Sequence, residues 1–186
     1  MILCAGRMEQ FAFAYPIGIG LVESAINLSR LCLFDPPEYL LFVGTAGSYG
    51  KYGIGDIITS TEATQIELSF LQNKSYTPIE NAISITDGLL ANETKVNSSN
   101  YISTDATLAR QLEKMGVGAE NMEFFAVMAV AQNFQIPAAG IFCITNFCNE
   151  KAHEEFKANH PHAMEKLDRL MRSRFDHLIT PSRTDR

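Results

Sequence analysis

Two polar side chains stand beside long apolar segments in the second half of this sequence, and together they could hold a ligand. Glu123 lies near the start of an apolar stretch over residues 122–134, and Asn146 ends another over residues 138–146. A carboxylate can accept hydrogen bonds from a sugar diol, and a carboxamide can donate to and accept from a heteroaromatic base. If both face one cleft, they suit a ligand with a sugar at one end and a base at the other. The alternatives are that Glu123 only favours the dipole of its helix and that Asn146 only caps the next helix.

The apolar pattern of the chain predicts strands that alternate with helices. We expect strands at 1–5, 11–17, 38–43, 56–60, 82–86, 94–97 and 138–144, and helices at 18–34, 104–115, 122–134 and 153–179. Residues 61–82 are polar and irregular, and no element is predicted there. This alternation is typical of an α/β fold with a mixed, mostly parallel central sheet flanked by helices. We predict one domain over residues 1–180 and a frayed C-terminal tail over 181–186.

Composition and charge argue against several classes of protein. The 186 residues carry a net charge of −6, whereas a general nucleic-acid surface needs a basic face. No apolar run approaches the length of a membrane span, and no basic region precedes an apolar one at the N-terminus. The four cysteines, which have no CxxC spacing and suit a reducing cytosol, are Cys4, Cys32, Cys143 and Cys148. We therefore expect a cytoplasmic protein without a metal site, a nucleic-acid partner or a membrane partner.

Small and polar residues follow three of the predicted strands. They are Gly6-Arg7, the Gly-Thr-Ala-Gly run at 44–47, and Thr145-Asn146. Ligands of open α/β sheets bind beyond the carboxyl ends of the strands, where free N–H groups and a hydroxyl could bind phosphate or sugar oxygens. The alternative is that the glycine-rich stretch at 44–55 is only a flexible turn cluster. It is neither a Walker A loop nor a GxGxxG fingerprint.

Several short motifs occur in an order that identifies a family. They are AGRME at 5–9, GIG at 18–20, GTAGSYG and GIGD within 44–56, NYIS at 100–103, Met-Glu at 122–123 and ITN at 144–146. Together they resemble the nucleoside phosphorylase and nucleosidase superfamily, which includes purine nucleoside phosphorylases, uridine phosphorylases and methylthioadenosine/S-adenosylhomocysteine nucleosidases. The resemblance implies a phosphorylase/hydrolase-like fold and cleavage of the bond between ribose and base through an oxocarbenium-like state.

The resemblance also implies roles for individual residues. In this family a glutamate that follows a methionine binds the ribose hydroxyls, which assigns that role to Glu123. The residue after Ile-Ser or Ile-Thr contacts the purine, which assigns Asn146 to the base, and an aromatic residue and an isoleucine pack on the base face. The further substrate-binding residues that we expect are Met122, Tyr101, Ile102, Ala46, Gly47 and Thr145.

Asn146 implies a preference among purines. Many hexameric phosphorylases and the nucleosidases have an aspartate there that protonates purine N7, whereas an amide is not an acid. The Ile-Thr-Asn triplet is similar to that of the trimeric phosphorylases, which act on inosine and guanosine. An amide can donate to a 6-oxo oxygen, but a 6-amino group would oppose it at a cost of about 1–3 kcal/mol. We therefore expect hypoxanthine or guanine nucleosides rather than adenosine.

The choice between phosphate and water as nucleophile depends on the ends of the first strands. Gly6, Arg7 and Thr45 match part of the family's phosphate site, with Arg7 as a plain surface residue as the alternative. The Gly-Asp-Pro loop is missing, and Phe42 replaces an arginine that usually precedes the second loop.

The nucleosidase pattern is also incomplete. Its water-activating glutamate falls on Phe11, so the role is missing unless Glu9 supplies it, and Phe142 replaces an arginine.

Because part of the phosphate site is present and the nucleosidase pattern is incomplete, we predict a purine nucleoside phosphorylase of purine salvage. Such an enzyme is a glycosyltransferase of the pentosyltransferase type. It would need no cofactor and would use inorganic phosphate as co-substrate, with Glu123 and Asn146 as its catalytic residues. Two alternatives stay open: a hydrolytic nucleosidase of the methylthioadenosine/S-adenosylhomocysteine type, and a non-catalytic nucleoside-binding protein of the same fold. The apolar first helix predicts a homo-oligomer, a dimer or a hexamer. His153 is the histidine nearest to Asn146 in the sequence, and no role is predicted for it.

Overall fold

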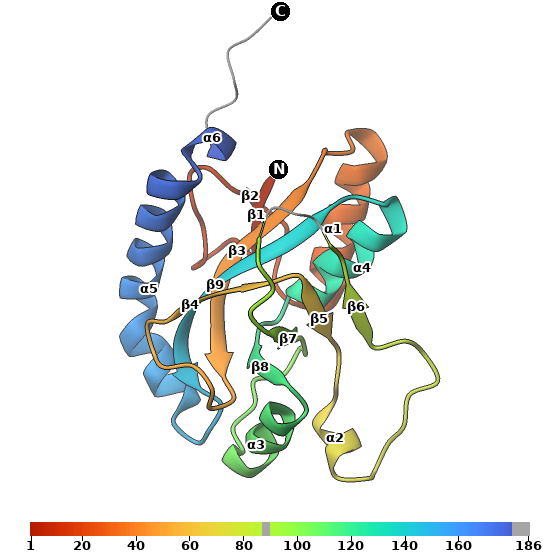
Figure 1. Ribbon diagram of the computed structural model, residues 1–186, viewed down its shortest axis with the longest axis vertical. Helices are drawn as coiled ribbons and strands as arrows, with labels where there is room; N and C mark the ends of the chain where they lie inside the picture. Colours follow the sequence, from red (N-terminus) through yellow and green to blue (C-terminus); the bar gives the residue numbers. More distant parts are fainter. Residues whose placement is uncertain (87–89, 180–186) are drawn as a thin grey trace, which may run out of the picture.

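The computed structural model describes residues 1–86 and 90–179, which build one mixed sheet of nine strands (Figure 1). The main path of the sheet is β2 (Tyr15–Pro16), β1 (Ile2–Cys4), β3 (Leu40–Ser48), β8 (Val117–Glu120), β7 (Lys95–Asn97), β5 (Glu62–Thr64) and β6 (Ala82–Ser84). A branch pairs β9 (Ala138–Phe147) with β3 and with β4 (Ile57–Ser60). Parallel pairing joins β1, β3 and β9, whereas the β3–β8, β4–β9 and β5–β6 pairs are antiparallel. The predicted α/β fold with a mixed sheet is confirmed.

Helices cover both faces of this sheet. Figure 1 shows α5 (Ala152–Arg174) along one side and α1 (Gly20–Phe34) and α4 (Phe124–Phe134) on the other. On the α1/α4 side, Leu28 and Met128 belong to one buried apolar cluster, and on the α5 side Leu167 belongs to a second. The short helices α2 (Leu68–Leu71) and α3 (Ala106–Lys114) lie outside these layers, whereas α6 (Asp176–Ile179) follows α5, and its Leu178 and Ile179 pack against the second cluster.

The central strands β3 and β9 explain why the apolar pattern of the sequence was informative. They pair in parallel from Leu40 opposite Ala138 to Ser48 opposite Phe147. All residues of β3, and all of β9 except the last, are buried, because helices cover both faces of the sheet. This pair brings the Gly-Thr-Ala-Gly run at 44–47 next to the Ile-Thr-Asn triplet at 144–146.

Two expectations about local structure are wrong, and two stretches contain elements that were not predicted. Only Tyr15–Pro16 of the predicted strand at 11–17 is a strand, and Phe11 and Phe13 instead stack their rings at 5.1 Å in the preceding turns. The run at 44–47 continues β3 and is not a loop. Strand β8 was missed, because it is short and its β-pairing depends on neighbours that are distant in the sequence. The irregular region 61–82 contributes β5, α2 and the first residue of β6.

Two further expectations concern surfaces and ends. Helix α1 exposes a row of apolar side chains, Val22, Ile26, Leu33 and Phe34, and the homo-oligomer stays a prediction. Residue 180 and the predicted tail at 181–186 lie outside the described residues. Within residues 1–86 and 90–179, no helix combines the length and apolar character that crossing a membrane requires.

Candidate active site

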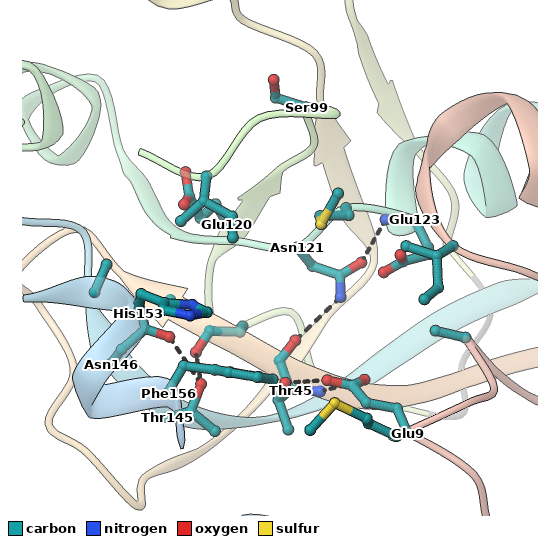
Figure 2. Close-up of a pocket in the computed structure, with 18 of the residues that line it drawn as sticks. Glu9, Thr45, Ser99, Glu120, Asn121, Glu123, Thr145, Asn146, His153 and Phe156 are labelled. Carbon is teal, nitrogen blue, oxygen red and sulfur yellow. Dashed lines mark hydrogen bonds between the residues drawn. The ribbon is translucent and has the colours of Figure 1, made fainter. Parts of the chain in front are cut away.

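One cavity of about 390 Å³ lies at the carboxyl ends of β1, β3 and β9, next to the start of α4 and of α5. Its size is within the range of small-molecule sites. All of the site residues predicted from the sequence line it: Gly6, Arg7, Thr45, Ala46, Gly47, Tyr101, Ile102, Met122, Glu123, Thr145 and Asn146. Glu123 and Asn146 therefore face a common cavity, as required for a ligand with a sugar and a base (Figure 2).

The start of α4 positions Glu123. Helix α4 begins at Phe124, and the residue that caps it is Asn121, whose Oδ1 accepts from the backbone N–H groups of Glu123 (2.8 Å) and Phe124 (2.9 Å). Asn121 also donates through Nδ2 to the carbonyl of Thr45 at 3.0 Å, which ties α4 to β3. The Glu123 side chain extends from α4 to the start of α1, where its Oε1 accepts from the backbone N–H of Gly20 at 2.9 Å. It thus lies at the N-terminus of α1, where the helix dipole favours a carboxylate.

Burial dominates the electrostatics of Glu123. It raises the pKa of this carboxyl from 4.5 to about 7, and the hydrogen bond from the Gly20 N–H opposes part of the rise. The charge of Glu9, which lines the same cavity, raises it further (Figure 2). Such a pair is typical of sites that handle protons or developing positive charge.

Glu9 reaches the cavity from a tight turn after β1. The N–H of Gly6 donates to the carbonyl of Glu9 at 3.0 Å, and the N–H of Glu9 donates back to Gly6 at 3.0 Å. Gly6 adopts a positive φ of 91°, which a glycine tolerates without strain, and Arg7 adopts a left-handed φ of 54°, which is uncommon for a residue with a side chain. The turn directs Glu9 toward β3, where its carboxylate accepts from the Oγ1 of Thr45 and from the backbone N–H of Thr45 at 3.1 Å.

The contact with Glu9 changes the role that the sequence suggested for Thr45. The hydroxyl and the N–H that were expected to bind phosphate hold a carboxylate of the same chain (Figure 2). The approach needs Gly44, because a Cβ there would lie 2.8 Å from the Oε2 of Glu9. Burial raises the pKa of Glu9, while the two hydrogen bonds from Thr45 lower it. Arg7, the expected phosphate cation, lines the cavity from the exposed tip of the turn.

Three aromatic rings form a buried cluster that reaches Glu9 through Phe42. The rings of Phe42, Phe124 and Phe142 pack at centroid distances between 5.1 and 6.4 Å, and all three are fully buried. A Cβ on Gly44 would lie 2.8 Å from Phe42 as well as from Glu9, so the Phe42 ring is close to the carboxylate. Two positions where the family resemblance implied arginines thus hold apolar rings, and the Phe42 ring lies where it helps to keep water from Glu9.

A β-bulge shapes the other end of the cavity. Ala46 pairs with Ile144 and Gly47 pairs with Asn146, which leaves Thr145 as the extra residue of β9. Bulges re-aim side chains next to active sites. The Oδ1 of Asn146 accepts from the Oγ1 of Thr145 at 2.9 Å, and its Nδ2 donates to the carbonyl of Phe147 at 3.2 Å. Asn146 therefore does not cap α5, which begins at Ala152.

The segment 99–103 lies at the mouth of the cavity. Tyr101 and Ile102 line it but are 79% and 53% exposed, so their stacking on a base stays a prediction. Hydrogen bonds hold this segment near both of its ends. Asn100 Oδ1 accepts from the N–H of Leu21 at 2.9 Å, and the N–H of Ser103 donates to Glu120 Oε1 at 2.9 Å.

Several lining residues were not predicted from the sequence. Glu120 lies beside the base end, where its Oε2 accepts from the hydroxyl of Tyr49 at 2.9 Å. His153 and Phe156 come from the first turns of α5, which follows β9 closely and therefore covers the cavity opened by the bulge. The proximity of His153 to Asn146 in sequence was the available signal. The part of the chain that the structure describes contains no group of three or more His, Cys, Asp or Glu side chains placed to hold a metal ion.

Comparison with known proteins assigns the chain to a family. Residues 4–175 match the family described as the phosphorylase superfamily. The chain belongs to this superfamily. Among curated proteins, it is similar to a 5′-methylthioadenosine/S-adenosylhomocysteine nucleosidase of Glaesserella parasuis serovar 5 (strain SH0165), at 24% identity over 83% of this chain and 76% of the relative.

Solved structures show the same fold. The superfamily member is similar to a mutant futalosine hydrolase of Helicobacter pylori strain 26695, with a TM-score of 0.78 and 18% identity over 95% of this chain and 97% of that chain. It is also similar to a mutant Helicobacter pylori nucleosidase with 5′-methylthioadenosine in its active site, with a TM-score of 0.74 and 22% identity over 87% of this chain and 78% of that chain.

These comparisons correct the predicted reaction class. The similar proteins are named as nucleosidases and as a hydrolase, so the assignment to the glycosyltransferases, as a pentosyltransferase and purine nucleoside phosphorylase, is wrong. The contacts of Thr45 explain why the sequence wrongly favoured a phosphorylase. Its residue type matches a phosphate ligand, but its hydrogen-bonding groups are occupied by Glu9.

Proposed function

We propose that this superfamily member hydrolyses the N-glycosidic bond of a purine nucleoside and releases the free base and the sugar. The observation that carries the proposal is the contact of the Glu9 carboxylate with Thr45. Phosphorolysis needs cations and N–H donors to bind phosphate, whereas hydrolysis needs a carboxylate that activates water. The names of the similar proteins support a nucleoside substrate and hydrolytic chemistry.

The charges of the cavity support water rather than phosphate as nucleophile. Three carboxyl-bearing residues line it, Glu9, Glu120 and Glu123, against one exposed arginine, Arg7. Like charges in a partly desolvated cavity repel a phosphate anion much more strongly than they do in bulk water. A neutral water molecule meets no such barrier and can donate to a carboxylate.

In the proposed mechanism, Glu9 acts as the general base. Each carboxylate oxygen has a second lone pair, so Glu9 can accept from a water molecule while it keeps its bonds to Thr45. Burial raises its pKa, which makes the carboxylate a stronger base. Glu123 binds the sugar hydroxyls, and its negative charge stabilises the positive charge that develops on the ribose as the bond to the base breaks.

The proposal is tested by following base release with and without phosphate. Inosine, guanosine, adenosine and 5′-methylthioadenosine are incubated with the purified protein in phosphate-free buffer, and the sugar product is identified. We expect a rate that does not depend on phosphate, with free ribose or methylthioribose as the product. Formation of the sugar 1-phosphate, or base release that requires phosphate, would reject hydrolysis.

At the base end, Asn146 is proposed to favour a 6-oxopurine. Its Nδ2 can donate to O6, whereas a 6-amino group would place two donors against each other. An Asn146→Asp variant should shift the ratio of kcat/KM values toward adenosine by about tenfold or more, since 1.4 kcal/mol corresponds to a factor of ten.

The matched control for this prediction is Asn133→Asp, which makes the same change on the exposed side of α4. It should leave the ratio between the nucleosides unchanged. A wild-type protein that cleaves adenosine faster than inosine would contradict the assigned role of Asn146.

A further inference from the structure

The proposed hydrolysis requires a proton at the leaving base, and the side chain at that position cannot supply it. A purine leaves more easily when N7 is protonated as the C1′–N9 bond breaks, because the electron pair of that bond then ends on a neutral base. Asn146 faces the base end of the cavity, but its carboxamide is not an acid at neutral pH. Another group must therefore provide the proton if the reaction is fast.

His153 is placed to do so. It lies in the first turn of α5 and lines the same cavity as Asn146. Figure 2 shows its ring at the end of the cavity that holds Asn146, away from Glu9. An imidazole is the side chain best suited to exchange protons near neutral pH. Because His153 is also exposed to solvent, bulk water can restore its proton after each turnover.

The carboxyl groups of the cavity already take part in other contacts. Glu9 accepts hydrogen bonds from Thr45, and Glu123 accepts one from Gly20 at the sugar end. Glu120 is near the base end, but its two oxygens accept from Ser103 N–H and from the Tyr49 hydroxyl, so it serves there as an acceptor. An arginine such as Arg7 does not release its proton in proteins.

We propose that His153 is the general acid that protonates the leaving purine, an inference that rests on the proposed function. In this step, Glu9 takes a proton from water, the water oxygen bonds to C1′, and the C1′–N9 electron pair passes to the base. The imidazolium of His153 gives its proton to N7 of that base. Glu9 then returns its proton to solvent, and solvent reprotonates His153, so that water is the only co-reactant.

The test replaces His153 by glutamine, which keeps a polar side chain but cannot act as an acid. With the nucleoside that the wild type cleaves fastest, we expect kcat to fall by about 10²-fold or more, in the range of general acid catalysis. His162→Gln is the matched control, because it makes the same change on the exposed surface of the same helix. It should retain wild-type activity.

Leaving groups that need no proton separate catalysis from structural damage. The 7-methyl derivative of the same nucleoside carries its positive charge at N7 already, and a 4-nitrophenyl ribofuranoside releases a stable anion. On these two substrates His153→Gln should stay within about threefold of the wild type. An equal loss on all substrates, or no loss on the natural nucleoside, would overturn the role of His153.

Two further outcomes are distinguishable. If Glu120→Gln rather than His153→Gln shows the dependence on the leaving group, then Glu120 is the acid and the proposal for His153 fails, while nucleoside hydrolysis stands. If the wild type releases no base from any nucleoside, the proposed function itself fails.

Discussion

A Glu9→Gln variant is expected to lose nucleoside hydrolysis by about 10³-fold in kcat, while its affinity for nucleoside changes by less than about threefold. Glutamine has nearly the shape of glutamate, and its carbonyl can still accept from Thr45, but it cannot take a proton from water. The loss should appear in kcat because Glu9 acts on the water molecule and does not hold the sugar or the base. Steady-state kinetics in phosphate-free buffer, together with equilibrium binding of the nucleoside, measure both quantities.

The matched control is Glu165→Gln on the exposed surface of α5, outside the cavity. It should keep full activity. A Glu9→Gln enzyme with wild-type kcat would show that another group activates the water. A variant that lost binding and kcat in equal measure would instead place Glu9 against the substrate itself.

The second large effect is a pH dependence of stability caused by Glu123. Its pKa is about 7 in the folded protein and 4.5 as a reference, so the folded state binds this proton more tightly than the unfolded chain does. The resulting stabilisation is fully present below pH 4.5 and is lost as the pH rises through 7, by about 3 kcal/mol. Glu9 contributes with the same sign, because burial raises its pKa too.

A Glu123→Gln variant should remove the Glu123 part of this dependence. Its carbonyl can still accept from the Gly20 N–H, but it has no charge to bury. We expect the variant to be more stable than the wild type by about 2–3 kcal/mol at pH 8 and nearly equal to it at pH 5, while its hydrolytic activity falls. Urea unfolding at the two pH values measures the difference.

Glu165→Gln again serves as the control, since an exposed carboxylate should give the same small change in unfolding free energy at both pH values. A Glu123→Gln protein that is less stable than the wild type at pH 8 would contradict the burial argument. Such a result would mean that the ionised carboxylate is better satisfied by the N-terminus of α1 than the pKa of Glu123 implies.

Much of the fold was predictable because its core is a parallel pair covered on both faces. Residues 40–43 and 138–144 are continuous apolar runs, and the run at 124–134 is apolar on nearly all sides, so burial alone identifies these elements. Strand β8 was not predictable, because a four-residue strand that contains Gly118 has little signal of its own. Its pairing with β3 and β7 provides the stabilisation.

The residues of the candidate site also fall into those that the sequence predicted and those that only the structure showed. The family motifs pointed to the ends of β3 and β9 and to the start of α4, and all of the predicted site residues in them line one cavity. The motifs did not reveal Glu120 or Phe156, because these side chains join the site through packing and not through spacing along the chain. In the sequence, His153 is only the histidine nearest to Asn146, whereas the position of α5 next to the bulge brings both side chains to one cavity.

By itself, the sequence determined the α/β architecture, the family and the residues that line the candidate cavity at Glu123 and Asn146, since apolar periodicity and ordered motifs are local properties of the chain. Only the tertiary structure decided what Thr45 binds. A turn of four residues after β1 returns Glu9 to β3, and the absence of a side chain at Gly44 leaves room for the carboxylate. Residue types at single positions could not distinguish a site for phosphate from one for water, because the difference lies in which groups meet through space.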